Sequence, residues 1–297
     1  MRIAIFIIAA MLWPVCARAE TVRPMTLQYE VYVGGVHLLD GAAHVDIGAK
    51  TYRAAAKAET VGVWGEWFPW ELAAESEGDA GDDSVTPKHH KLVSAWKHKP
   101  QSILLDYHDD GRVTYNDAST DAPEPQERLA DDMVRSTFDP LSGVLQLMAH
   151  YMAHQDCNAR AAVFDGKHRF DLIAKDLGTV NLRASEASAY AGPAHKCELR
   201  FDMIAGQGMK QDAGIKKFWQ PMRGRGNRPP FTVWLGQIRP DLPPLPVRAE
   251  SESPFGMVMI NLQSWKLDPA PVIPAAVKSV KAKPARIQSA KFKSKTH

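Results

Sequence analysis

The sequence predicts a mainly β protein: a single antiparallel, curved β domain, in the form of an open barrel or β-spiral, with one long central helix. Apolar and polar residues alternate through residues 25–116 and again through 157–266, and this two-residue period is typical of half-buried strands. Clear helical spacing occurs at residues 137–154. Because the chain shows no regular strand–helix–strand alternation, antiparallel hairpins are favoured over a parallel sheet.

The first strands are expected on either side of short turn signals. The segment TLQYEVYVGGVHLLDGAAHVDI alternates around Gly34-Gly35 and Asp40-Gly41, and both pairs are interpreted as turns. TYRAAAKAETVG, residues 51–62, continues the strand pattern. Further along, SILLDYH and RVTYN flank Asp109-Asp110-Gly111, which predicts a hairpin between them.

The helix is expected after an acidic, proline-bearing segment at 117–132 that is interpreted as an exposed loop. Ser136 or Asp139 can cap the helix, and Pro140 suits its first turn. The predicted apolar stripe consists of Leu141, Val144, Leu145, Met148 and Met152.

The strand pattern resumes after this helix. Asp165-Gly166 lies between alternating runs and predicts a hairpin with a type I′ turn, which needs positive φ at both central positions. KCELRFDMIAG reads as a strand, and residues 206–230 are a Gly- and Lys/Arg-rich interruption, interpreted as a loop. Three closing strands are expected before residue 267.

The ends of the chain carry their own signals. Residues 1–19 combine Arg2, an apolar run too short for an ordinary membrane span, and Ala17-Arg18-Ala19 as a cleavage site, which is typical of a secretory signal peptide. The alternative is an N-terminal anchor that is never cut. A β-rich domain is then expected at 20–267, and residues 268–297 form a Pro-, Ala- and Lys-rich tail that predicts disorder. The first nineteen residues therefore predict export.

Charge is distributed unevenly between the domain and the tail. Of 36 basic residues, two lie in the leader and seven in Lys278–His297, which leaves 27 basic against 34 acidic residues in the remainder. An acidic body argues against nucleic-acid binding. The basic tail could contact an anionic envelope surface, or it could simply be a solubilising end.

Two cysteines, Cys157 and Cys197, remain after the expected cleavage. An even number of cysteines in an exported chain favours a disulfide. The alternatives are two free buried thiols or a two-cysteine metal site.

The ordered set of these segments resembles a known family. The Tyr-rich first strand with its Gly-Gly turn, AETVG followed by aromatics, FDPLSGVLQL, VFDGKHRFDL and LPVRAESESPFGMVMINL are similar to the bacterial envelope family catalogued as domain of unknown function 3108. The two-cysteine pattern resembles its alphaproteobacterial members. The resemblance covers nearly all of residues 25–266, implies a β-rich periplasmic protein, and transfers no catalytic residue.

Candidate site residues are few. Asp165 and His168 could form an acid–base pair, but neither a nucleophile nor a metal ligand lies at a known spacing from them, so a hairpin is favoured. His150 and His154 have the i, i+4 spacing of zinc ligands but lack the Glu of the metalloprotease pattern. They are therefore weak metal candidates, and we expect no catalytic residue and no cofactor.

The aromatic cluster VGVWGEWFPW is the strongest candidate for a contact surface. Trp64, Trp67, Phe68 and Trp70 could form part of the core, line an apolar groove, or meet a membrane, where amphipathic Trp is favoured.

Three classes of function remain open. The first is a non-enzymatic periplasmic protein that supports envelope integrity by binding a hydrophobic or envelope-derived ligand, such as a lipid or glycan, or a partner protein. The second is a structural protein with a filled core that acts through its surface and basic tail. An envelope hydrolase or metal protein is the third.

Overall fold

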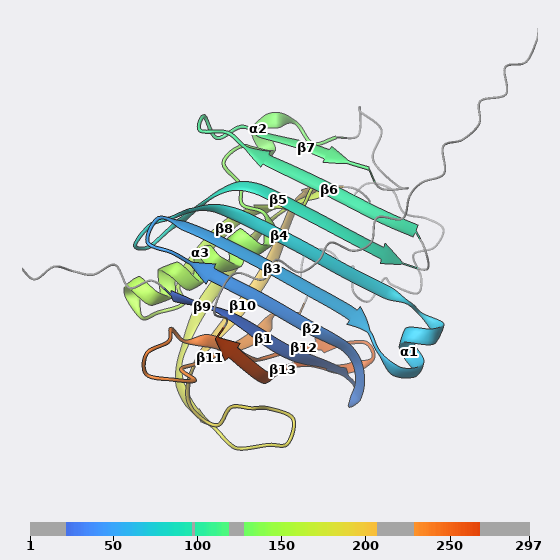
Figure 1. The fold of residues 1–297 in the computed structure, drawn as a ribbon, viewed down its shortest axis with the longest axis vertical. Helices are drawn as coiled ribbons and strands as arrows, with labels where there is room; N and C mark the ends of the chain where they lie inside the picture. Colours follow the sequence, from blue (N-terminus) through green and yellow to red (C-terminus); the bar gives the residue numbers. More distant parts are fainter. Residues whose placement is uncertain (1–21, 97–98, 119–127, 207–228, 268–297) are drawn as a thin grey trace, which may run out of the picture.

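A computed structural model describes residues 22–96, 99–118, 128–206 and 229–267. The described chain forms a 13-stranded antiparallel sheet (Figure 1). Its strands are β1 (Val22–Val33), β2 (Val36–Ile47), β3 (Thr51–Thr60), β4 (Trp70–Ala80), β5 (Val85–Trp96), β6 (Lys99–Tyr107), β7 (Val113–Asp117), β8 (Ala159–Phe164), β9 (His168–Leu182), β10 (Gly192–Gly206), β11 (Phe231–Gly236), β12 (Leu245–Ser253) and β13 (Gly256–Leu267). The predicted mainly β, curved antiparallel class is confirmed.

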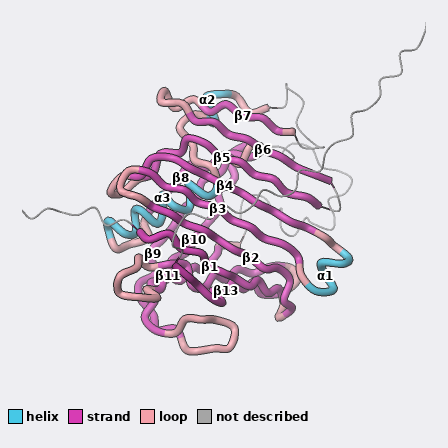
Figure 2. Tube along the Cα trace, in the orientation of Figure 1, coloured by secondary structure: helices cyan, strands magenta, loops and turns pink. Residues whose placement is uncertain are grey.

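The sheet is built from two meanders joined in the middle. Strands β1–β7 and β8–β13 each pair in chain order, and β1 pairs with β13, so that β7 and β8 lie at the two edges. The sheet curves back on itself without closing into a continuous barrel (Figure 2). At the β8 edge, Phe138 forms an isolated parallel bridge with Val163.

Only some of the predicted turns are turns. Gly34 and Gly35 both have positive φ and connect β1 directly to β2, as a type I′ hairpin requires. The prediction of a turn at Asp40-Gly41 was wrong. Both residues lie in β2 and pair with β1, where Gly41 is opposite Tyr29. The Asp165 hairpin exists, but the type I′ prediction was wrong: three residues connect β8 to β9, and of these only Gly166 has positive φ.

The long helix α3 (Pro140–His154) begins three residues later than predicted. Its N-cap is Asp139, whose side chain accepts hydrogen bonds from the backbone N–H groups of Leu141 and Ser142. The helix cannot extend back to residue 137, because Phe138 is hydrogen-bonded to β8 instead. A short helix, α2 (Asp131–Val134), lies at the end of the segment predicted as a loop.

Helix α3 packs inside the curve of the sheet, against β3, β4 and β5 on one side and β8 and β9 on the other. Its buried residues include Ser142, Gly143, Leu145 and Tyr151. The predicted apolar stripe was partly wrong, since the side chains of Val144 and Met152 are about two-fifths exposed. A Cβ at Gly143 would lie only 2.7 Å from Cγ2 of Val163. Because Gly143 has no side chain, the helix can approach β8 closely at this point.

The apolar core consists of several clusters, three of which include residues of α3. One joins β1, β12 and β13 to the loops that precede β10 and β12; another joins β6 and β7 to Phe164 of β8. In the part of the chain that is described, no helix is long and apolar enough to cross a membrane. The expected leader at 1–19, most of the 206–230 loop and the tail at 268–297 lie outside the described residues.

Candidate functional site

The aromatic cluster predicted from the sequence forms a projecting helical turn, α1 (Gly62–Trp67), between β3 and β4. Gly62 starts the turn with a φ of +58°. At Gly65 a Cβ would lie 2.7 Å from the Thr60 carbonyl oxygen, so only glycine lets the turn sit this close to β3. Thr60 Oγ1 donates to the Phe68 carbonyl and accepts from the Trp70 N–H, each at 3.0 Å. These contacts hold α1 in one place.

The side chains of α1 point away from the core. Trp67 is 71% exposed and Val63 68%, while Trp64 and Phe68 are 43% and 37% exposed and stack with ring centroids 6.0 Å apart. Trp70 begins β4 and is partly buried. The core alternative is therefore wrong for the aromatic residues of α1 and its C-cap, and the surface alternative is the one that fits.

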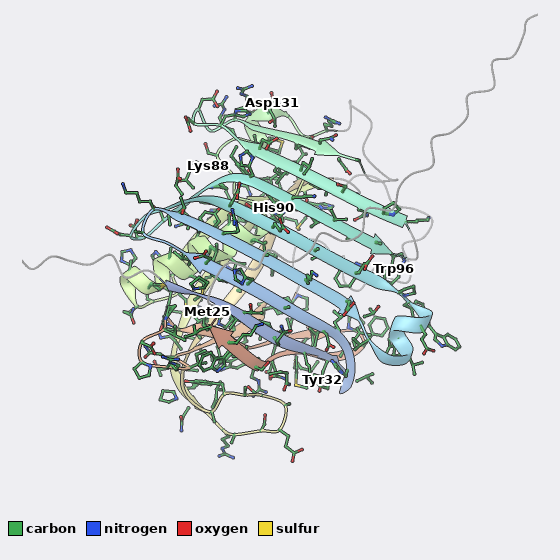
Figure 3. The ribbon with its side chains drawn as sticks, in the orientation of Figure 1. Met25, Tyr32, Lys88, His90, Trp96 and Asp131 are labelled. Atoms are coloured by element: carbon green, nitrogen blue, oxygen red, sulfur yellow. A yellow bond between two sulfur atoms is a disulfide. The ribbon has the colours of Figure 1, made fainter. Side chains whose placement is uncertain are left out.

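More exposed apolar residues continue this surface along the same end of the sheet. We call the set the aromatic rim: Val36, Val63, Trp64, Trp67, Phe68, Trp96, Phe255 and Met257. Its members lie on neighbouring turns and strand ends. The Gly34 N–H donates to the Met257 carbonyl, the Val61 N–H donates to the Leu38 carbonyl, and Trp96 pairs with Trp70. Figure 3 shows Trp96 and Tyr32 toward this end of the sheet and Lys88 toward the opposite end.

Sequence reasoning missed the part of the rim that lies outside α1. Val36 and Phe255 sit at tight turns, where polar residues are the usual choice, and this was the available signal. Pairing of β1 with β13 brings their two turns together, and no local pattern predicted that pairing.

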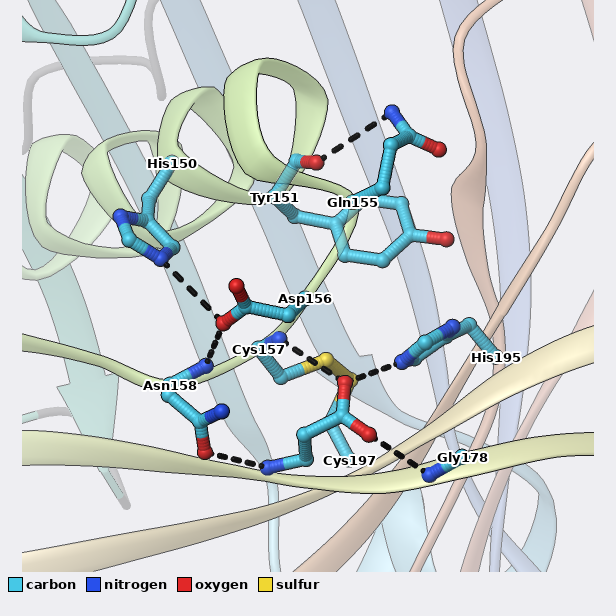
Figure 4. A network of polar contacts seen from close by, with 10 residues as sticks. His150, Tyr151, Gln155, Asp156, Cys157, Asn158, Gly178, His195 and Cys197 are labelled. Carbon is cyan, nitrogen blue, oxygen red and sulfur yellow. Dashed lines mark hydrogen bonds and ion pairs between the residues drawn. A yellow bond between two sulfur atoms is a disulfide. The ribbon is translucent and has the colours of Figure 1, made fainter.

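A second group of residues surrounds the disulfide between Cys157 and Cys197, which the structure contains as predicted, with Cα atoms 5.9 Å apart. Figure 4 shows how its neighbours converge from α3, β9 and β10. Asp176 accepts hydrogen bonds from the backbone N–H of Cys157 at 3.1 Å and of Gly178 at 2.8 Å, and it is also hydrogen-bonded to His195. The ring of Tyr151 packs edge-on against that of His195, with centroids 5.0 Å apart.

Asp176 is held ionised by these partners. Desolvation opposes its charge, but the hydrogen bonds from His195 and from the two backbone N–H groups outweigh it and keep the pKa of Asp176 below its usual value. A local irregularity in the β9–β10 register, next to Gly178 with its φ of +77°, accompanies this arrangement.

His150 and His154 do lie side by side on α3, with ring centroids 4.4 Å apart. Within the described residues, however, neither belongs to a group of three side chains at metal-ligand spacing. Nε2 of His150 instead lies 3.5 Å from Oδ1 of Asp156. The group with ligand spacing here is Cys157, His195 and Cys197, whose ligand atoms all lie within 4.8 Å of one another. Sequence reasoning missed His195, although its position two residues before Cys197 on a strand was a signal.

A third group is buried between α3 and the sheet and contains Ser76, His90 and Asp139. Ser76 Oγ donates to Asp139 Oδ1 at 2.6 Å and lies 2.8 Å from His90 Nδ1, which is itself 3.1 Å from Asp139 Oδ1. Serine and carboxylate thus meet the same ring nitrogen, whereas a catalytic triad needs them on opposite nitrogens. All three side chains are almost completely buried. The group therefore joins the helix to the sheet and offers no nucleophile to a substrate.

The pKa of Asp139 is lowered within this network. Burial acts to raise it, but hydrogen bonds and the charge interaction with His90, together with hydrogen bonds from Ser142 and Ser76, outweigh the desolvation.

Asp165 and His168 meet at the β8–β9 turn as the hairpin interpretation requires. Asp165 Oδ1 accepts the backbone N–H groups of Lys167 and His168, and Oδ2 lies 3.1 Å from His168 Nδ1. These bonds define a turn.

The chain matches one family model and is similar to a solved structure. Residues 28–263 match the family model described as Protein of unknown function (DUF3108). The chain belongs to this family. Among solved structures it is similar to a crystal structure described as a beta-barrel-like protein of domain of unknown function DUF1849 from Brucella abortus, at 10% identity and a TM-score of 0.47, covering 84% of this chain and 99% of that one. The chain matches no curated protein.

Proposed function

We propose that this chain is an exported, non-enzymatic envelope protein that binds the membrane–water interface of a phospholipid bilayer through its aromatic rim. The observation that supports this most strongly is the outward display of Trp64, Trp67 and Phe68 on a turn held by Thr60 and Gly65. Amphipathic aromatic rings favour the membrane–water interface. A rigidly presented set loses little conformational entropy on binding.

The expected affinity is modest. Burying a large apolar side chain completely contributes about 1.5–3 kcal/mol. Because Trp64, Trp67 and Phe68 are already partly covered, we expect about 1 kcal/mol from each. The seven basic residues of Lys278–His297 supply a second attraction of up to about 1 kcal/mol per residue at an anionic surface. Stable association of this kind needs two signals together.

A buried lipid is less well supported as the ligand. The apolar cavity between α3 and strands β9–β12 has a volume of about 70 Å³. Ligand pockets usually enclose about 300–1,000 Å³. We therefore favour contact with a surface over enclosure of a ligand.

The expected location rests on two features. The Cys157–Cys197 disulfide is compatible with an oxidising compartment, and the first nineteen residues predict export. Periplasmic proteins face phospholipid on both sides of that space, so a bilayer surface is within reach of the rim.

The experiment is vesicle flotation with the full mature chain and vesicles of phosphatidylethanolamine and phosphatidylglycerol. We expect the wild type to float with the vesicles and the double variant Trp64→Ser/Trp67→Ser to lose at least about tenfold in bound fraction. The matched control is Leu177→Ser/Val180→Ser, which removes two exposed apolar side chains of β9. A wild type that stays unbound overturns the proposal, as does equal binding by the rim variant and the control.

Deleting residues 278–297 separates the two attractions. We expect the truncated and the full chain to bind neutral phosphatidylcholine vesicles equally weakly, through the rim alone, and only the full chain to bind anionic vesicles more strongly. If the wild type fails to bind any vesicle but crosslinks through the rim to a defined envelope protein, the rim is a protein interface and the bilayer proposal is wrong.

A further inference from the structure

The disulfide site holds more ligand-type atoms than a structural crosslink needs. Cys157 and Cys197 are almost completely buried, and a ring nitrogen of His195 lies within 4.8 Å of both sulfur atoms. Two thiolates and one imidazole are ligands that zinc prefers. Figure 4 shows His195 beside the disulfide.

We propose that the reduced form of this protein binds one thiophilic divalent cation of the zinc class through Cys157, Cys197 and His195. The disulfide and the metal ion are then alternative occupants of one site. The proposal concerns a site away from the aromatic rim and is independent of membrane binding.

The backbone geometry suits both states. The Cα atoms of the two cysteines are 5.9 Å apart. On a tetrahedral zinc ion, with Zn–S bonds of about 2.3 Å, the two sulfur atoms would be roughly 4 Å apart. Rotation of the two cysteine side chains can provide that separation without displacing a strand. The adjoining cavity of about 70 Å³ is lined by both cysteines, and this exceeds the roughly 30 Å³ that one water molecule occupies.

The electrostatics favour a cation. Asp176 is hydrogen-bonded to His195, so a carboxylate adjoins the three ligands. Asp176 is bonded to Nε2 of His195, which leaves Nδ1 as the nitrogen with a lone pair for the ion. A carboxylate on the opposite ring nitrogen of a ligating histidine orients the ring and increases its basicity in metal sites. The other group with ligand spacing in the described chain, Glu30, His37 and Asp40, has no sulfur and is more exposed.

The chemistry balances as two steps. A dithiol reductant transfers two electrons and two protons to the disulfide, which gives two cysteine thiols and one reductant disulfide. The metal ion then displaces the two thiol protons, while neutral His195 donates its lone pair. Oxidation reverses the sequence and releases the ion.

The test uses the mature chain reduced with a phosphine, kept free of oxygen and titrated with Cd²⁺ and with Zn²⁺. Thiolate-to-Cd²⁺ charge-transfer absorption reports sulfur coordination, and competition with a chromophoric chelator reports Zn²⁺ affinity. We expect one ion per reduced chain and none in the oxidised chain. His195→Ala should weaken Zn²⁺ binding at least about tenfold, and Asp176→Asn by a similar factor.

His37→Ala is the matched control, because it removes a histidine from the other group and should leave binding unchanged. Circular dichroism follows folding throughout. If the reduced chain unfolds, Zn²⁺ should restore its native spectrum, and His195→Ala should prevent that recovery. A reduced chain that binds no ion, or that binds equally well without His195, overturns the proposal.

Discussion

The buried carboxylate of Asp139 gives the sharpest test of how the helix is attached to the sheet. Asp139 accepts hydrogen bonds from the first turn of α3 and from side chains on β4 and on the helix itself. Replacing it with Ala removes the helix cap and leaves Ser76, His90 and Ser142 buried without their charged partner. We expect this substitution to lower the free energy of unfolding strongly.

The magnitude follows from the contacts that are lost. An N-cap side chain contributes about 1 kcal/mol, and hydrogen bonds to a charged group contribute roughly 1.5–3 kcal/mol each. Because bonds within one network are not additive, we expect about 4 kcal/mol for Asp139→Ala. Asp139→Asn keeps one acceptor for the cap but loses the charge, and it should cost about 2 kcal/mol. Either value is a large share of a typical domain stability of about 5–15 kcal/mol.

The assay is urea unfolding with the disulfide intact, followed by tryptophan fluorescence and circular dichroism. Asp106→Asn is the matched control, because Asp106 lies 2.7 Å from His89, the neighbour of His90 on β5, but on the exposed side of the sheet. An exposed pair contributes about 0–1 kcal/mol. The reasoning fails if Asp139→Ala costs less than about 1 kcal/mol, or no more than the control.

Three further predictions concern pH, packing and covalent linkage. Because the pKa of Asp139 is lowered in the folded state, the carboxylate's contribution to stability is complete at pH values well above the ordinary aspartate pKa and is lost as pH falls through the folded-state pKa. The stability difference between wild type and Asp139→Asn should therefore shrink in acid, and urea unfolding that shows a constant difference contradicts this. Gly143→Ala should destabilise by about 1–2 kcal/mol despite better helix propensity, since its Cβ would meet Val163 at 2.7 Å; a gain in melting temperature refutes the close-approach argument. Cys157→Ser/Cys197→Ser removes a crosslink with a sequence separation of 40 and should cost about 4 kcal/mol in chemical unfolding, and an unchanged midpoint contradicts that value.

The two proposed sites lie in different parts of the fold. The aromatic rim lies on turns and strand ends, where substitution should disturb the sheet little, and this is the usual place for binding residues on a rigid scaffold. The disulfide group instead lies where α3 meets β9 and β10, so a change in its covalent state acts on the packing of the helix. Binding to a surface and response to reductant can therefore be measured separately.

Local sequence signals were enough to predict features that depend on neighbouring residues in the chain. Asp139 was one of the two predicted caps of α3, and it is the cap in the structure, with Pro140 in the first turn as predicted, because these signals act within four residues. The predicted start at residue 137 was three residues too early. Alternation specified the strands, and Gly34-Gly35 specified a tight hairpin. The Cys157–Cys197 pair followed from the even count of cysteines that remains after the expected cleavage.

Tertiary structure decided what local signals leave open. Asp40-Gly41 reads as a turn, yet it lies in β2 because pairing with β1 and β3 outweighs the turn preference. A cluster of tryptophans suits a core or a surface equally well, and only the position of α1 on β3 left Trp64 and Trp67 exposed. His195 reached the cysteines because β9, β10 and the end of α3 converge. Alternation of apolar and polar residues predicts a strand with two different faces. What covers each face depends on residues far away in the chain.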